Sequence, residues 1–173
     1  MTSNSAVELK TKELLSNLGI KEAPIPVELI AKKLGVDVRF SPLDDELSGM
    51  IFMQGGKAII GVNSMHHPNR QRFTIAHELG HFILHKKHIT SEIHVDKQFR
   101  VLMRDGKSAT GTERIEIEAN RFAASLLMPE DLVAKALDEH EFDIDDEAPL
   151  VDLAKQFKVS KQTMEYRIRN LGI

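Results

Sequence analysis

Apolar side chains recur at helical spacing near the start of the chain and predict two helices there. Four leucines between positions 9 and 18 follow this spacing and Gly19 comes directly after them, so we expect a first helix over roughly residues 5–18. Pro26 suits the first turn of a helix and Gly35 the position just past its end. A second, shorter helix is therefore predicted from Pro26 to Gly35.

The next apolar runs are short and predict strands. Residues 36–40, 49–53 and 57–62 each have the length and apolar content of a strand. Gln54, Gly55 and Gly56 supply a tight turn between the last two, which we therefore expect to form a hairpin. Residues 99–104 alternate in the manner of an edge strand, within an otherwise patternless stretch from 87 to 112.

Two long helices are predicted in the middle of the chain. Residues 68–86 are apolar around most of a helical circumference, which indicates a buried helix. Residues 113–128 form a second strongly helical run, and Pro129 begins another helix. An acidic loop follows at 138–147, and residues 150–173 predict two short helices joined by a turn, with Ser160 as the N-cap of the second. This pair has the form of a helix-turn-helix.

Composition narrows the chemistry that the chain can perform. The 173 residues include no cysteine, which excludes disulfides, thiolate metal ligands and cysteine nucleophiles. Any metal must therefore be held by His, Asp or Glu. The formal net charge of −3 gives no overall attraction to nucleic acid or anionic membranes, and no apolar run is long enough to span a bilayer. We expect a cytoplasmic protein.

The sequence His77-Glu78-Leu79-Gly80-His81 lies on the first of the two long predicted helices. At 3.6 residues per turn the two imidazoles project from one face, while Glu78 is rotated by about 100° and can reach a water on a shared metal ion. We therefore predict that His77 and His81 bind a metal and that Glu78 is the catalytic base.

A catalytic zinc usually takes three protein ligands, so the two histidines need a partner. Glu116 is the first candidate because it lies on the second long helix, four residues before Asn120, so that both side chains face the same way. Glu116 can then bind the metal while Asn120 orients a ligand. Glu113 is the second choice, and Glu118 is rotated away from Glu116.

Further candidates surround this predicted site without a spacing argument to choose among them. His85 continues the His77, His81 series and is a ligand, a hydrogen-bond donor to the transition state, or neither. Arg121 and Tyr166, which is the only tyrosine, are alternative donors to a developing oxyanion.

With these residues identified, the chain resembles the ImmA/IrrE family of zincin-like metallopeptidases, found in bacteria and their mobile elements. The resemblance is carried by residues 73–85 and 116–129 and extends from the Pro26 helix to the C-terminus. It implies one Zn²⁺ per chain, bound by His77, His81 and Glu116, with Glu78 as the general base. Known relatives cut or oppose transcriptional repressors, so the resemblance implies a helix-turn-helix repressor as the protein substrate.

The resemblance also implies an α+β fold. We expect a zincin-like core of a small sheet, an active-site helix and a second ligand-bearing helix. Residues 1–137 would form the peptidase domain, and residues 138–173 the acidic loop and the helix-turn-helix-like segment, packed on the same domain. Substrate should lie extended along residues 49–53 or 57–62 as an added strand.

Two alternatives remain open. In the first alternative, the chain is a DNA-binding regulator that uses its terminal helix pair and keeps only a structural metal site. In the second, it is a non-cleaving protein that binds a repressor or toxin. The net charge of +3 over residues 158–173 favours the first, and the acidic run before them opposes it. DNA binding is therefore not favoured.

Overall fold

A mixed four-stranded sheet covers one side of a long helix, α3 (Pro68–Leu84). In the computed structural model β1 (Val36–Ser41) pairs in parallel with β3 (Lys57–Asn63), and β2 (Gly49–Gln54) pairs with β3 in antiparallel fashion. A short strand, β4 (His94–Asp96), pairs antiparallel with β2, so the order is β1-β3-β2-β4. The structure describes residues 4–89, 94–96, 111–139 and 148–173.

The helices of the first half lie where the sequence predicts them. Helix α1 spans Asn4–Asn17, and α2 spans Val27–Lys33. Pro26, the predicted first residue of this helix, is its N-cap, so α2 begins one position later than predicted. A one-turn helix, α4 (Lys86–Ile89), follows α3 and was not predicted.

The second half is helical, and its ends follow the expected capping rules. Helix α5 spans Gly111–Leu127, α6 spans Glu130–Asp138, α7 spans Ala148–Phe157 and α8 spans Lys161–Leu171. The Ser160 hydroxyl accepts a hydrogen bond from the Thr163 amide at 3.1 Å, which makes it the predicted N-cap of α8. The expected α+β fold is thus confirmed. The predicted strand at 99–104 and most of the acidic loop lie outside the described residues.

The hairpin of β2 and β3 is confirmed, and its turn needs glycine. Gly55 and Gly56 have φ values of 57° and 78°, the left-handed conformations of a tight two-residue turn. The expectation that a substrate pairs with residues 57–62 is wrong, and in the alternative segment, 49–53, residues 49–51 are already paired with β4. Strand β3 lies between β1 and β2, so the backbone groups on both of its edges are already paired.

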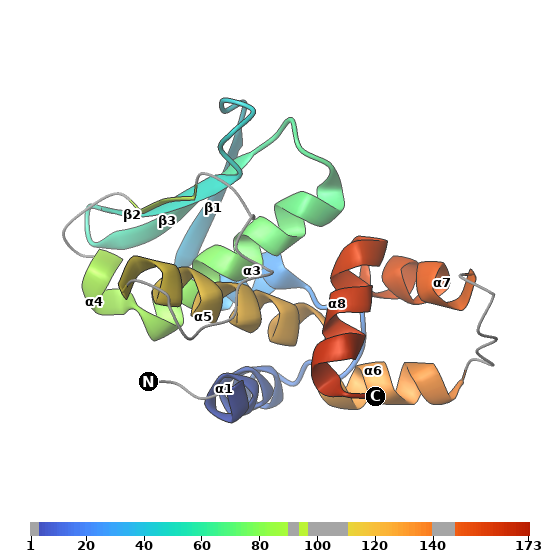
Figure 1. The fold of residues 1–173 in the computed structure, drawn as a ribbon. Helices are drawn as coiled ribbons and strands as arrows, with labels where there is room; N and C mark the ends of the chain where they lie inside the picture. The colour runs from blue at the N-terminus through green and yellow to red at the C-terminus, as the bar shows by residue number, and fades with distance from the viewer. Residues whose placement is uncertain (1–3, 90–93, 97–110, 140–147) are drawn as a thin grey trace.

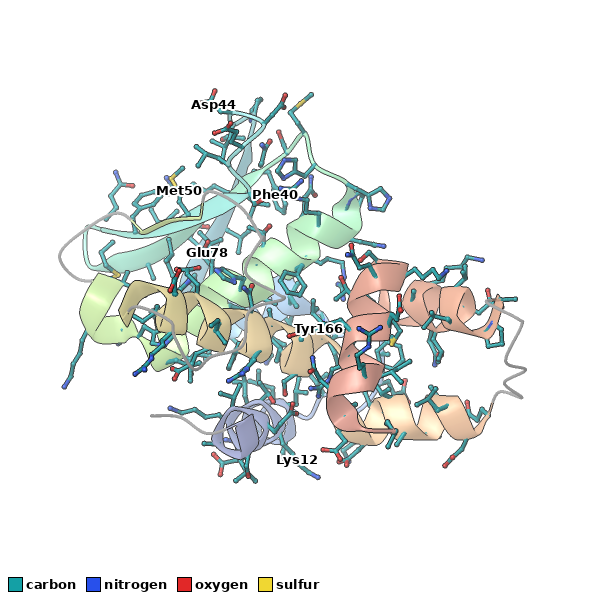
Figure 2. All side chains as sticks on the ribbon, in the orientation of Figure 1. Lys12, Phe40, Asp44, Met50, Glu78 and Tyr166 are labelled. Atoms are coloured by element: carbon teal, nitrogen blue, oxygen red, sulfur yellow. The ribbon has the colours of Figure 1, made fainter. Side chains whose placement is uncertain are left out.

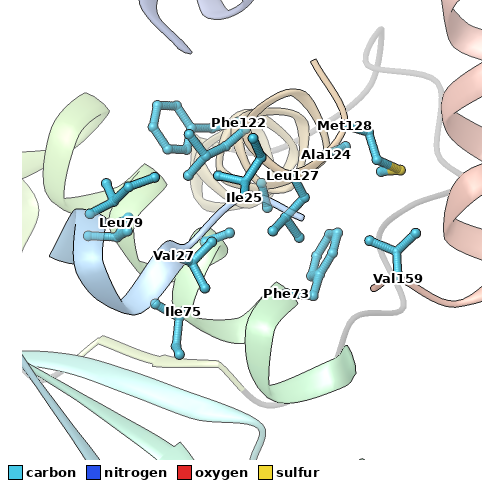
Figure 3. Close-up of a cluster of buried hydrophobic side chains, with 14 of the residues drawn as sticks. Ile25, Val27, Phe73, Ile75, Leu79, Phe122, Ala124, Leu127, Met128 and Val159 are labelled. Atoms are coloured by element: carbon cyan, nitrogen blue, oxygen red, sulfur yellow. The ribbon is translucent and has the colours of Figure 1, made fainter. Parts of the chain in front are cut away.

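Helix α3 is the centre of the packing. It contacts the sheet on one side and α5 on the other, and α1 lies against the far side of α5 (Figure 1). Figure 3 shows Leu79 of α3 and Phe122 and Leu127 of α5 among the buried apolar side chains of this interface. No helix in the described part of the chain has both the length and the apolar character needed to cross a bilayer.

Helices α3 and α5 approach each other closely at Gly80. A Cβ atom added at Gly80 would lie 3.1 Å from the Cα of Ala119 and 3.2 Å from its carbonyl oxygen. It would also lie 3.2 Å from the Cβ of Phe122. These are atoms of a rigid helix that cannot rotate aside, so a side chain at position 80 forces the two helices apart.

A buried ion pair joins α1, α5 and α8. Arg167, which is 4% exposed, donates from Nη2 to the Glu8 carboxylate at 2.9 Å and from Nε to the carbonyl oxygen of Met128 at 2.9 Å. Ser125 donates to the same carboxylate at 2.6 Å. Burial raises the pKa of the Glu8 carboxyl, but the hydrogen bonds from Arg167 and Ser125 outweigh burial, so the pKa is lowered.

We predict that Gly80→Ala lowers the free energy of unfolding by about 1 kcal/mol. Alanine favours the helical backbone by about 1 kcal/mol, but overpacking of a tight interface costs about 1–3 kcal/mol. Gly111→Ala is the matched control, because nothing lies within 4 Å of a Cβ at that helical glycine. Urea denaturation measures both variants, and a Gly80→Ala protein as stable as Gly111→Ala would contradict the close approach.

We predict that Glu8→Gln lowers the free energy of unfolding by about 2 kcal/mol at about pH 7, because it leaves the buried Arg167 without its countercharge. Since the pKa of Glu8 is lowered by folding, its carboxylate stabilises the protein above its ordinary pKa and loses this effect as the pH falls through the folded value. The difference between the two proteins should therefore shrink below about pH 4. A difference that is independent of pH would refute the assignment.

Candidate metal centre

Three predicted ligands converge between α3 and α5. The Nε2 atoms of His77 and His81 lie 3.0 Å apart. One carboxylate oxygen of Glu116 lies 3.2 Å from the first of these nitrogens and the other lies 3.5 Å from the second. The three ligand atoms all fall within 4.8 Å of one another, and both imidazoles are buried.

The donor set fits a divalent cation. Two imidazole nitrogens and a carboxylate are a common ligand set for zinc, and they can surround one ion from three directions. Burial raises the pKa of Glu116, but hydrogen bonds and charge interactions with His77 and His81 outweigh burial and hold the pKa well below its ordinary range. Glu116 is therefore a carboxylate at neutral pH, as a metal ligand must be.

Asn120 fixes the orientation of the His77 ring. Its side-chain oxygen lies 2.9 Å from Nδ1 of His77, and as an amide carbonyl it accepts a hydrogen bond from that nitrogen. The proton of the neutral ring then resides on Nδ1, which leaves the lone pair of Nε2 directed toward Glu116 and His81. Asn120 lies one turn after Glu116 on α5, so a single helix supplies both groups.

Glu78 lies at the junction of α3 and the sheet. It is fully buried, and Figure 2 shows it between the sheet and α5. Strand β2 passes close by, since a Cβ added at Gly49 would lie 3.8 Å from Oε1 of Glu78 and only 2.3 Å from Cγ2 of Thr74. Glycine at position 49 thus lets β2 run directly beside the predicted catalytic base.

The remaining candidates occupy other positions. His85 pairs with Glu118, with Nε2 and Oε2 3.0 Å apart, and its ring centroid lies 5.5 Å from that of His81. Glu118 thus contacts α3 but is outside the group of three ligands, as is Glu113. Arg121 is exposed on α5, and Tyr166 lines a separate groove between α8 and the start of α3.

Two glycines that shape this centre were missed at the level of sequence. Gly80 lies inside the histidine motif and Gly49 begins a predicted strand, so each was assigned to its element without a reason for being glycine. A glycine within a buried helix costs stability relative to alanine, which is a signal that a neighbouring backbone approaches closely there.

Comparisons with known proteins agree with this geometry. Residues 31–169 match the peptidase family described as the IrrE N-terminal-like domain. The radiation response metalloprotease IrrE of Deinococcus radiodurans is 35% identical over 142 residues, which cover 81% of this chain and 38% of that protein.

A solved structure shows the same fold. A transcriptional regulator from Mycobacterium tuberculosis superposes with a TM-score of 0.63 at 20% identity, over 94% of this chain and 46% of that one. The chain thus spans less than half the length of either protein. The family match covers most of this chain and includes the three converging ligands and Glu78. The chain therefore belongs to the IrrE N-terminal-like domain family of metallopeptidases.

Proposed function

We propose that this chain is a zinc-dependent endopeptidase. The observation that carries the proposal is the convergence of His77, His81 and Glu116 on one point, with the buried Glu78 next to His77 on α3. Membership of a peptidase family supports the same reaction. Peptide hydrolysis needs a Lewis acid and a base within reach of one water, and these four residues supply the ligands and the base.

Each residue has a distinct part in this mechanism. Zinc held by the three ligands supplies Lewis acidity toward a water and the scissile carbonyl. Glu78 takes the proton of the attacking water and passes it to the leaving amine. Asn120 holds the His77 ring in the tautomer that a ligand requires. Burial of Glu78 excludes bulk water from the proton transfer.

The substrate approaches from the edge of the sheet that carries β4. Strand β2 lies beside Glu78, and β4 already pairs with its residues Gly49, Met50 and Ile51, so among the described strands the edge offered to a peptide on this side is that of β4. An extended peptide gains main-chain hydrogen bonds at a sheet edge with little demand on its sequence. Specificity must then come from contacts outside the sheet.

We propose a protein substrate, with a helix-turn-helix repressor as the first candidate. The family resemblance supports this choice, and the similar protein from Deinococcus radiodurans is a radiation response metalloprotease by name. Labelling of new protein N-termini in cells that express the unsubstituted chain or Glu78→Gln would identify the substrate. A repressor fragment present only with the unsubstituted chain supports the proposal.

We predict that Glu78→Gln retains zinc and lowers the cleavage rate of that substrate by at least about 10²-fold, because the amide cannot accept the proton of the water. Fragment formation and bound zinc are measured on the same preparations. Glu13→Gln, an exposed substitution on α1, is the matched control and should leave both unchanged. Equal cleavage by Glu78→Gln and the control would refute the role of Glu78.

We predict that Asn120→Ala raises the dissociation constant for zinc by about 10–100-fold, because the His77 ring loses the partner that fixes its tautomer. Competition with a zinc-binding dye measures the constant. Asn170→Ala provides the same change at an exposed position near the C-terminus. Affinities that coincide for the two variants would show that Asn120 does not orient a ligand.

A further inference from the structure

Strand β1 forms the edge of the sheet that lies opposite to β4. Of the described strands, only β3 pairs with it, through residues 36–41. Several side chains of β1 are open to solvent, since those of Asp37 and Arg39 are 52% and 57% exposed and Phe40 is 43% exposed. An edge strand presents backbone donors and acceptors that can pair with a further strand.

The side chains of β1 alternate between an apolar and a charged face. Val36 belongs to the hydrophobic core and Val38 packs against it, so both point toward the helices, which lie together on one side of the sheet in Figure 1. Asp37 and Arg39 point to the opposite face. A strand that extends the sheet at β1 and matches both faces must therefore carry apolar and charged residues in the same alternation.

The two charges of β1 already contact each other but can bind further groups. Nε of Arg39 donates to Oδ2 of Asp37 at 3.0 Å. This bond uses one of several N–H donors of the guanidinium, and a carboxylate accepts more than one hydrogen bond. Since both side chains are about half exposed, the charges of a neighbouring strand can reach them.

A second copy of β1 has the required alternation, provided that the two strands run antiparallel about a two-fold axis at Val38. Asp37 then lies opposite Arg39 of the second copy on the charged face, and Val36 lies opposite Phe40 on the apolar face. Side chains that are directly opposite have Cβ atoms about 4.5–5.5 Å apart, so each carboxylate reaches the guanidinium of the other copy. The axis is perpendicular to the sheet, which keeps the helices of both copies on one side.

The charges also exclude the neighbouring registers. A shift by two residues places Arg39 opposite Arg39 of the second copy, or Asp37 opposite Asp37, and like charges that are directly opposite destabilise a sheet. A shift by one residue sets the charged face of one strand against the apolar face of the other. Charge complementarity thus selects one register and one occupant, which is a second copy of this chain.

We propose that two copies of this chain associate through β1 in this register and join their sheets into one continuous sheet. The contact covers only one short strand of each copy, so the dimer is reversible. Phe40 loses part of its exposed area in the dimer. The edge at β4, which the proposed function gives to the substrate, lies on the far side of the sheet and stays open. The proposal therefore does not depend on peptidase activity.

Sedimentation velocity of the full, zinc-loaded chain tests the association over about 1–500 µM at about 50 mM salt. We expect a dimer fraction that rises with concentration. Asp37→Arg and Arg39→Asp should each raise the dissociation constant of the dimer by at least about tenfold, because both attractions across the axis become repulsions. Glu22→Arg and Lys10→Asp change the charge equally at exposed positions outside the sheet and should change it by less than about twofold.

A mixture of the two β1 variants separates lost pairing from a damaged fold. When Asp37→Arg and Arg39→Asp are mixed in equal amounts, arginine on one copy lies opposite aspartate on the other at both positions. Fluorescein on one of the variants lets sedimentation follow the mixed dimer, which should form with a dissociation constant within about threefold of that of the unsubstituted chain. A mixture of Glu22→Arg with Lys10→Asp controls for general charge attraction and should show no tighter association than either variant alone.

Four outcomes would overturn the proposal. The unsubstituted chain could remain a monomer up to about 500 µM, which excludes a dimer of useful affinity. The β1 variants and their controls could weaken the dimer equally, or the β1 variants could leave it unchanged, which would place the contact elsewhere. Mixing the β1 variants could also fail to restore the dimer.

Discussion

The close approach of α3 and α5 at Gly80 is the constraint on which the rest of the structure depends. His77 and His81 occupy one helix and Glu116 the other, so the distance between the helices determines whether three ligand atoms can share one ion. Gly80 lies directly before His81, and the backbone of Ala119 lies 3.1 Å from where a Cβ would project. The residue that permits this contact is thus part of the histidine motif itself. A second glycine, Gly49, lets β2 pass close to Thr74, one turn before Glu78 on α3.

The surroundings of this contact give its polar groups defined roles. Glu116 and Asn120 follow each other by one turn on α5, so the carboxylate reaches both histidines while the amide holds the ring of His77. At the other end of α5 the buried pair of Arg167 and Glu8 connects α8 to α1. This pair, together with the hydrogen bonds that Asn69 and Arg72 of α3 donate to the turn between α7 and α8, holds the terminal helices against α3. The helix pair that resembles a DNA-binding unit in sequence is therefore held against α3 and α1 of its own chain.

Much of the fold could be predicted from local patterns, because helical periodicity, glycine turns and capping residues act over a few positions. The hairpin, the helix with the histidines and the N-cap at Ser160 are of this kind. The parallel pairing of β1 with β3 is a non-local contact that no turn signals, and it makes β3 an inner strand. Strand β4 pairs with β2 from a stretch without clear periodicity. At the candidate site the spacing of Glu116 and Asn120 placed both on the face of α5 that lies toward His77, whereas the need for glycine at 49 and 80 depends on which backbones meet in space.

The proposed chemistry requires that zinc binds to two residues of α3 and one of α5. Anomalous diffraction above the zinc absorption edge, from crystals of the zinc-loaded protein, locates the ion without reference to activity. We expect one strong peak per chain, about 2.0–2.2 Å from the Nε2 atoms of His77 and His81 and from the carboxylate of Glu116. A peak held by other residues, or none between α3 and α5, would contradict it.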